Sequence, residues 1–383
     1  MNFEESAETG MLRQAVSEIT AKFGSAYYQK VVAEDAKTTE LWTALGRAGF
    51  IGVNLPERYG GGGGGIAELA IVCEETAAAG CPLLLLLVSS AICGEVLKSF
   101  GTEDQCRRWL PAMASGEDKM VFAITEPDAG SNSHNISTTA RRDGDEWLLS
   151  GTKYYISGVD EASQMLVVAR TGTSESGRGR LSLFVVDCDD PALQRSPIPV
   201  EVRAPEKQFT LFFDDVRVSA DRLVGAEGDG LRIVFHGLNP ERITGASIET
   251  GIGRYALAKA ADYARQRSVW GTPIGAHQGV SHPLAAAAIE VELARLMTSK
   301  AAWMHDRGQP AGEASNMAKY AAAEAALAAL DASIQTHGGN GMASEYGLAH
   351  LWGMARLLRI APVSREMILN YVAQHTLDLP RSY

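Results

Sequence analysis

The sequence predicts an α+β protein built from three consecutive regions in the order α, β, α. From residue 7 to about residue 119, Ala, Leu and Val recur every three or four positions, the period of a helix with one buried face. The pattern then changes to short alternating stretches between turn residues, which is typical of β-strands. Long alanine-rich stretches restore the helical period after residue 230. We therefore expect an N-terminal helical domain (1–119), a middle β domain (120–230) and a C-terminal helical bundle domain (231–383).

Two segments punctuate the first helical region. The run Gly60–Gly65 predicts a flexible loop, because six glycines cost too much backbone entropy to lie inside a helix or strand. The apolar run Leu83–Val88 is far shorter than the roughly 20 residues that cross a bilayer. Pro82, which precedes it, is typical of a helix N-terminus, so we expect a buried helix and no membrane insertion.

The middle region predicts several short strands. Asp143-Gly144 is a strong signal for a hairpin turn leading into the first of them. The expected strands include 146–150, 165–169 and 181–186. The last region predicts helices at about 242–267, 282–307, 314–337 and 363–374.

Composition limits the classes of partner. The 383 residues carry a formal net charge of −11, which argues against nucleic acid or an anionic membrane as the main partner. An anionic ligand remains compatible if a few Lys or Arg lie around it. The five cysteines form no CxxC pair and no Cys/His cluster, so we expect free thiols and no metal site. With an acidic N-terminus that lacks a signal sequence, this favours the cytoplasm.

Two neighbouring segments of the β region carry candidate binding groups. The first, Phe122–Ser131, leads from a strand into a Pro/Gly turn whose backbone N–H groups could meet a planar cofactor or a phosphate. The second, Leu149–Ser157, alternates so that Tyr155 and Ser157 would share one face. Taken singly, the first segment is equally compatible with an ordinary surface turn, and the second favours an ordinary strand with one buried face.

Taken together, five segments resemble the acyl-CoA dehydrogenase family along essentially the whole chain. FAITEPDAGS (122–131) is similar to the family's TEP.AGSD turn, and SGTKYYIS (150–157) to its NG.K.(W/Y)I(S/T) strand. In order there follow NPER (239–242), then YARQRSVWGTPIGAHQ (263–278) and QTHGGNG (335–341). The resemblance implies a middle domain like a β-barrel and a C-terminal four-helix bundle.

The resemblance also implies FAD, bound between subunits. Expected cofactor contacts in the β domain are Phe122, Ile124, Thr125, Gly130, Ser131, Tyr155, Ile156 and Ser157. Those expected from helical segments, mostly of a neighbouring subunit, are Arg267, Trp270, Gln278, Gln335, Gly338, Gly339 and Ser364. Ser131, Asn239 and Arg242 would contact the substrate. The Arg267 guanidinium is suited to a pyrophosphate, with which it can form forked contacts. Without the resemblance, Arg267 would be interpreted as an exposed helix end and Gly338 and Gly339 as a helix C-cap.

The chemistry needs a base that removes the α proton of the acyl group while a hydride leaves the β carbon. Many family members carry this glutamate in a C-terminal YEGT segment, where this sequence has Pro362. The isovaleryl-CoA and long-chain enzymes place it instead at the position matched by Glu241, which we expect at the head of a long helix opened by Asn239-Pro240. The alternative role of Glu241 is a first-turn acid stabilised by the helix dipole.

Two departures from the family pattern bear on the reaction. The thioester oxygen of family substrates accepts a hydrogen bond from the backbone N–H at the YEGT glutamate, and Pro362 has no N–H. Losing such a donor costs roughly 10²–10³ in rate. Either a neighbouring amide substitutes, with Val363 the first candidate, or the carbonyl is held differently. Asn132 stands where the family commonly has Asp.

The resemblance therefore implies FAD-dependent α,β-dehydrogenation of an acyl-CoA, with an electron-transferring flavoprotein as acceptor and a homotetramer as assembly. Three alternatives stay open: a dehydrogenase acting on an acyl-carrier protein, a flavin monooxygenase or oxidase of the same fold, and a non-catalytic partner subunit. Glu241 argues against the second, and the retained Arg267 and Gln278 argue against the third.

Overall fold

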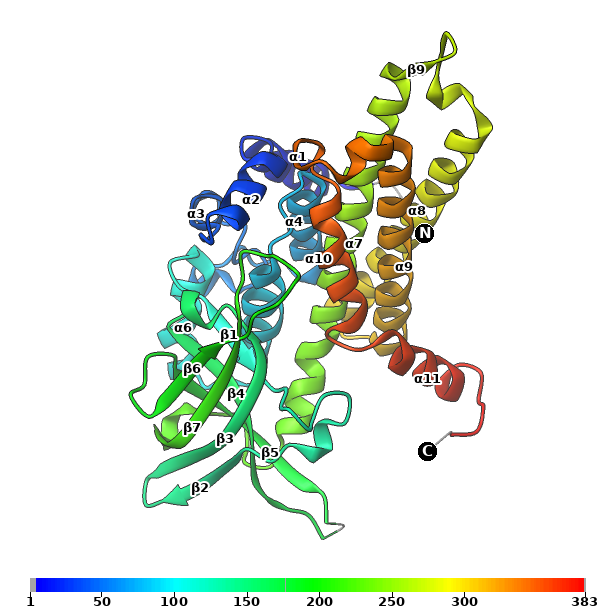
Figure 1. The fold of residues 1–383 in the computed structure, drawn as a ribbon. Coiled ribbons are helices and arrows are strands. Elements are labelled where there is room, and N and C mark those ends of the chain that lie inside the picture. The colour runs from blue at the N-terminus through cyan, green and yellow to red at the C-terminus, as the bar shows by residue number, and fades with distance from the viewer. Residues whose placement is uncertain (1–4, 176, 382–383) are drawn as a thin grey trace.

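A computed structural model describes residues 5–175 and 177–381 and confirms the α, β, α order (Figure 1). The secondary structure changes from helix to strand between Ser115 and Met120, and from strand back to helix at Gly230. The domain boundaries at 119 and 230 remain a prediction. The N-terminal helices are α1 (Ala7–Thr20), α2 (Gly24–Ala33), α3 (Thr39–Arg47), α4 (Ile66–Ala78), η2 (Leu86–Gly94), α5 (Glu95–Phe100) and α6 (Glu103–Ser115). No helix within the described ranges is long and apolar enough to span a membrane.

The glycine run is a loop, as predicted, but its backbone is fixed by hydrogen bonds. The N–H groups of Gly62 and Gly63 donate to the carbonyls of Gly52 and Leu55, at 3.0 and 2.9 Å. A Cβ on Gly61 would lie 2.2 Å from the Leu55 carbonyl oxygen, so only glycine fits there. The close approach of the Gly61 backbone to the Leu55 backbone therefore requires glycine at this position.

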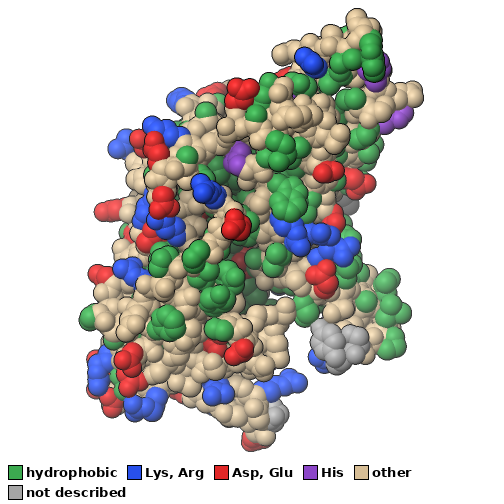
Figure 2. Space-filling model, viewed as in Figure 1, with side chains coloured by type: hydrophobic (Ala, Val, Ile, Leu, Met, Phe, Trp, Pro, Cys, Tyr) green, Lys and Arg blue, Asp and Glu red, His purple; other side chains and the backbone are tan. Residues whose placement is uncertain are grey.

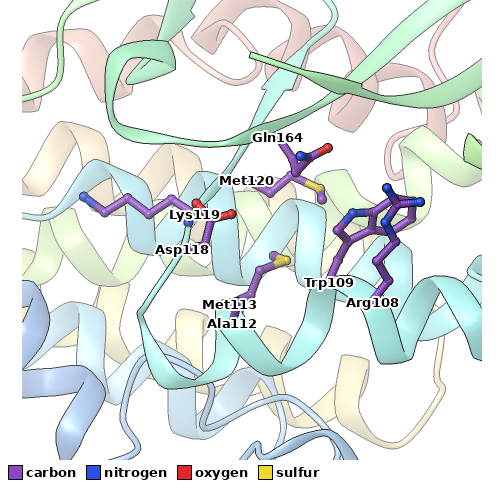
Figure 3. Close-up of a pocket in the computed structure, with 8 residues that line it drawn as sticks. All are labelled: Arg108, Trp109, Ala112, Met113, Asp118, Lys119, Met120 and Gln164. Atoms are coloured by element: carbon purple, nitrogen blue, oxygen red, sulfur yellow. Dashed lines mark hydrogen bonds between the residues drawn. The ribbon is translucent and has the colours of Figure 1, made fainter. Parts of the chain in front are cut away.

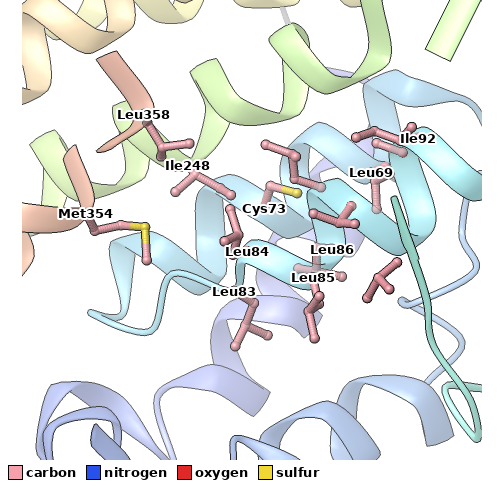
Figure 4. Close-up of a cluster of buried hydrophobic side chains, with 14 of the residues drawn as sticks. Leu69, Cys73, Leu83, Leu84, Leu85, Leu86, Ile92, Ile248, Met354 and Leu358 are labelled. Carbon is pink, nitrogen blue, oxygen red and sulfur yellow. The ribbon is translucent and has the colours of Figure 1, made fainter. Parts of the chain in front are cut away.

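The apolar run 83–88 is buried and helical, with two differences from the prediction. The helix begins at Leu84, whose N–H donates to the buried Glu206 carboxylate at 3.1 Å. From Leu86 to Gly94 it is a π-helix, a geometry that composition does not predict. Figure 4 shows this segment packed among α4, α7 and α10 through Leu69, Cys73, Leu83, Leu84, Leu85, Leu86, Ile92, Ile248, Met354 and Leu358.

One sheet forms the middle domain. Its strands are β1 (Met120–Ala123), β2 (Thr139–Asp143), β3 (Glu146–Ser157), β4 (Gln164–Thr173), β5 (Gly179–Asp187), β6 (Leu193–Pro197), β7 (Gln208–Ser219) and β8 (Leu223–Val224). They pair in the order β6-β7-β3-β2-β4-β5-β8, with β1 parallel to β4. The predicted hairpin is confirmed: Asp143 pairs with Glu146 across a two-residue turn in which Gly144 has φ +64°.

Among the described residues, the C-terminal region has five α-helices: α7 (Gly230–Gln266), α8 (Gln278–Asp306), α9 (Gly312–His337), α10 (Ala349–Ile360) and α11 (Arg365–His375). Four of them, α7 to α10, pack together as a bundle, whereas α11 follows α10 and lies beside the start of α9 (Figure 1). The short hairpin β9 (Ser268–Val269) and β10 (Thr272–Pro273) joins α7 to α8. The sequence prediction missed α10.

The predicted start of α7 was wrong. We expected Asn239-Pro240 to open the helix, but α7 begins at Gly230 and Pro240 lies inside it. Proline usually ends or kinks a helix because it has no N–H for the carbonyl four residues earlier. Here the preceding residues Ile233, Val234 and Gly237 are buried, so the helix packs into the core before it reaches the proline. Glu241 therefore lies within a long buried helix, which removes the helix-dipole role that a first-turn position would have given it.

Candidate active site

A buried ion pair joins the two candidate segments of the β domain. Lys153 on β3 is fully buried, and its Nζ lies 2.9 Å from Glu126 Oε1 and 2.9 Å from the Ile124 carbonyl oxygen. Glu126 also accepts hydrogen bonds from the backbone N–H groups of Ser137 and Thr138, at 2.7 and 3.0 Å. The pair thus locks the Phe122–Ser131 turn against β3.

The surroundings of this pair favour the ionised form of the Glu126 carboxylate. Burial opposes ionisation of Glu126, but Lys153 and the surrounding donors outweigh it and lower the pKa of Glu126 to about 2. Burial lowers the pKa of Lys153 to about 8, although Glu126 acts in the opposite direction. We conclude that Glu126 and Lys153 form a charged pair held by hydrogen bonds. Removing either partner would leave an uncompensated buried charge.

Beside this pair, β3 carries a bulge at Tyr154 and Tyr155. Register with β7 shifts between Lys153 and Ile156, and the Tyr154 N–H donates to the Thr125 carbonyl at 2.9 Å. Tyr155 has φ +56° and is 51% exposed, while Ile156 is buried. The simple alternation assumed for Tyr155 and Ser157 is therefore interrupted at Tyr155. Bulges of this kind re-aim side chains beside active sites.

The structure brings the β-domain candidates together. Phe122, Ile124 and Thr125 end β1 and begin the turn, and Gly130 and Ser131 are exposed at its tip. Ile156 and Ser157 end β3; the Ser157 hydroxyl donates to Gln208 at 2.9 Å. Asn132, at the position that departs from the family, is exposed.

The helical candidates lie elsewhere in the chain. Arg267, Trp270 and Gln278 are exposed around the β9–β10 hairpin, at the end of α7 far from the sheet (Figure 1). Gln335, Gly338 and Gly339 are exposed at the end of α9. The neighbouring His337 ring stacks on Tyr263 of α7, with centroids 4.3 Å apart. One chain therefore presents two separate groups of candidate residues, called half-sites below, which is the arrangement expected if the cofactor site is shared between subunits.

The half-sites fit a flat, phosphate-bearing group such as FAD. A Cβ on Gly130, Gly338 or Gly339 would meet no atom within 4 Å, so ligand can approach the backbone there. Trp270 is 91% exposed. Apart from glycines, the described residues with positive φ are three aspartates and the aromatics Tyr155 (+56°) and Trp270 (+52°). Bulky residues in this region are strained, and such strain gathers at functional sites.

Glu241 is a buried carboxylate with an unused oxygen. It is 8% exposed, and its Oε2 has no hydrogen-bond partner among the described residues. Burial raises the pKa of Glu241 to about 8, against the opposing effects of Arg242 and Lys319. A carboxylate with a pKa near neutrality and a free oxygen is suited to accept a proton.

Two residues of α9 complete the surroundings of Glu241, and sequence reasoning missed both. The Arg242 guanidinium donates to Asn316 Oδ1 at 2.9 Å, leaving its Nε unpaired. Lys319, one turn further along α9, donates to the carbonyls of Arg359 and Val363. The available signal was the presence of two polar residues three positions apart in an alanine-rich helix.

The segment after α10 carries the departure at Pro362. The backbone N–H of Val363 has no acceptor in the part of the chain that the structure describes, so it is free to bind a ligand. The Ser364 side chain caps α11 by accepting from the Met367 N–H at 3.3 Å. Asn239 is half-buried on α7, three residues before Arg242.

Two surface hollows lie away from these residues. A cavity of about 190 Å³ between α6 and the sheet is lined by Trp109, Met113, Met120 and Gln164 among others (Figure 3). A larger hollow of about 620 Å³ is lined by Lys37, Trp42 and Lys119 among others. Neither hollow is lined by a predicted site residue. The candidate site is therefore located by the burial and hydrogen bonding of the residues described above. Charged side chains of both signs are spread over the face in Figure 2.

Comparison with known proteins agrees along the whole chain. Residues 6–117, 121–216 and 228–377 match the N-terminal, middle and C-terminal acyl-CoA dehydrogenase domains. Acyl-CoA dehydrogenase FadE12 of Mycobacterium tuberculosis is 56% identical over 384 residues, covering 100% of this chain and 99% of its own. The glutaryl-CoA dehydrogenase–glutaryl-CoA complex is 32% identical, with TM-score 0.95, and the match covers 100% and 98% of the two chains. The FAD complex of PigA is 25% identical, with TM-score 0.93, over 99% and 100%.

Proposed function

Because this chain belongs to the acyl-CoA dehydrogenase family, we propose that Glu241 is the base of its reaction. The protein is an FAD-dependent oxidoreductase that acts on acyl-CoA thioesters. The proposal concerns which residues perform the α,β-dehydrogenation. The observation that carries it is the buried Glu241 carboxylate, whose Oε2 is unpaired and whose pKa is raised to about 8.

Glu241 would remove the α proton of the acyl group with its free oxygen. The α proton of a thioester is weakly acidic, so the base must be desolvated and ionised at the working pH. Burial supplies the desolvation, and the positive charges of Arg242 and Lys319 favour ionisation. Proline at position 362 cannot take over this role, because it has no acid/base group.

The negative charge that develops on the thioester oxygen needs a hydrogen-bond donor. The free N–H of Val363 supports its assignment as that donor, in place of the N–H that Pro362 lacks. Asn239 and Arg242 would line the approach of the CoA thioester along α7. Ser131 would contact substrate from the turn of the β domain.

The FAD site would be formed by the two half-sites of different subunits. When bound, FAD supplies the hydride acceptor for the β carbon. Thr125, Ser131, Tyr155 and Ser157 would hold it from one chain, and Arg267 would face the pyrophosphate from another. Gln278, Gln335 and the two glycines at 338 and 339 would complete the second half-site. Ser364 would contact the cofactor near the substrate.

Self-association follows from this division of the site, and we adopt a homotetramer. An apolar stripe on α8 supports it: Ile289, Leu293, Leu296 and Trp303 are 60, 54, 47 and 49% exposed at helical spacing. We propose an electron-transferring flavoprotein as acceptor, because the two electrons must leave each reduced site before the next turnover. The five cysteines are free and buried, which supports a reducing compartment such as the cytoplasm.

Anaerobic titration with a panel of acyl-CoAs, followed by flavin absorbance, tests the assignment. Wild type should bleach with at least one acyl-CoA, whereas Glu241→Gln should bind it and stay oxidised. Glu206→Gln is the matched control, because Glu206 is also a buried glutamate whose pKa burial raises, to about 7, and its carboxylate accepts from the Leu84 N–H and not from a proposed site residue. Bleaching of Glu241→Gln at the wild-type rate would remove Glu241 from the mechanism.

A further inference from the structure

Lys319 stands out as a buried ammonium to which no role has been given. It lies in the middle of α9 and is 3% exposed. Its Nζ donates to the carbonyl of Arg359 at 3.1 Å and to that of Val363 at 2.5 Å. Burying a lysine is costly unless it gains strong partners, and both partners here are backbone carbonyls of one short segment.

That segment carries Pro362 between the two bonded carbonyls. The bonds fasten it at both ends to α9, the helix that also holds Arg242 through Asn316. Lys319 thus holds Val363, whose N–H is the proposed donor to the thioester oxygen, against α9.

The same ammonium acts on the proposed base. Groups that face Glu241 are Arg242 on α7, Lys319 on α9 and the buried thiol of Cys93 on η2. Groups that face Lys319 are Glu241, Arg242 and Glu249 on α7 and Glu366 on α11. The charges of Arg242 and then Lys319 favour the ionised form of Glu241, while burial lowers the pKa of Lys319 itself to about 8.

We propose that Lys319 is a positioning residue of the dehydrogenation: its bonds to the Arg359 and Val363 carbonyls hold the Pro362 segment for thioester binding. It acts through Val363, without touching the reacting atoms. The inference rests on the proposed function, since it assigns Lys319 a role only if the thioester oxygen binds beside Pro362.

Two variants separate the hydrogen bonds of Lys319 from its positive charge. Lys319→Gln keeps N–H donors for the carbonyls but removes the charge, and Lys319→Met removes both. Lys319→Arg keeps the charge and should restore part of the activity. Lys119→Met is the control, because Lys119 is also a buried lysine (7% exposed) but pairs with Glu161 beside Trp42 of α3.

The measurement is the rate constant of anaerobic flavin reduction by one acyl-CoA across pH, on FAD-loaded protein. Lys319→Met, which removes the bonds to the two carbonyls, should lower the high-pH limit of the rate constant about 10²-fold, whereas Lys319→Gln, which keeps N–H donors, should retain more of it. Lys319→Gln should also raise the midpoint of the profile, because loss of the positive charge disfavours the ionised form of Glu241. A wild-type high-pH limit in Lys319→Met, with Glu241→Gln inactive, would overturn this inference alone. Wild-type reduction by Glu241→Gln would instead overturn the proposed base.

Discussion

Replacing Glu241 by glutamine should stabilise the protein, and increasingly so as the pH rises. The folded-state pKa of about 8 lies above the ordinary value of 4.5. The folded protein therefore binds this proton more tightly than the unfolded chain does. The stability linked to Glu241 is fully present below about pH 4.5 and is lost as the pH rises through about 8. Glutamine does not titrate, so the variant escapes this loss.

The magnitude follows from the size of the pKa shift. At about 1.36 kcal/mol per pH unit, wild type loses about 4 kcal/mol relative to Glu241→Gln between about pH 5 and about pH 9. This is an upper limit, because local relaxation and water entry reduce the cost of the buried charge. For a chain of this length it corresponds to a difference of about 5 °C in Tm.

Thermal unfolding of both proteins at several pH values measures the difference. Only the difference between the proteins is informative, because Glu206 and Glu249 are also buried acids with raised pKa values and contribute equally to both. A saturating FAD concentration should be used throughout, since bound ligand itself raises Tm. If the Tm difference is the same at acid and alkaline pH, Glu241 is not a desolvated acid in the folded protein and the reasoning fails.

Three further predictions concern the cofactor and the thioester. Lys153→Met should leave Glu126 charged and unpaired, destabilise the protein by about 3–5 kcal/mol and lower its flavin content; the double variant with Glu126→Gln should recover stability, and no recovery would argue against the ion pair. Val363→Pro should slow anaerobic flavin reduction about 10²–10³-fold, whereas Val363→Ala, which keeps the N–H, should not; equal rates would exclude this amide as the donor. Arg267→Ala should weaken FAD binding about tenfold to a hundredfold in reconstitution titrations, and unchanged binding would place Arg267 outside the site.

Local patterns predicted the architecture well where a pattern is compatible with only one type of secondary structure. The helical and alternating periods gave the three regions, and Asp143-Gly144 gave the hairpin. They failed where local chemistry is ambiguous: Asn239-Pro240 is as suited to opening a helix as to lying inside one. Only burial of the preceding residues, which include Ile233 and Val234, distinguishes the two, and burial depends on the rest of the fold.

The candidate site was predictable in its motifs but not in its supporting contacts. Glu126 and Lys153 were both inside recognised segments, and their opposite charges were a usable signal that they pair. Asn316 and Lys319 meet α7 and the Pro362 segment across long sequence separations, which a single sequence does not reveal. The bulge that turns Tyr155 out of the strand alternation depends on pairing with β7, and it too required the structure.

Exchange of the α hydrogens of a bound thioester tests the central claim most directly. A 3-thia-acyl-CoA has sulfur at the β position and cannot give up a hydride, so loss of its α hydrogens to D2O reports proton removal alone. Wild type and Glu206→Gln should exchange these hydrogens, and Glu241→Gln should bind the thioester without exchange. Exchange by Glu241→Gln at the wild-type rate would show that another group removes the proton.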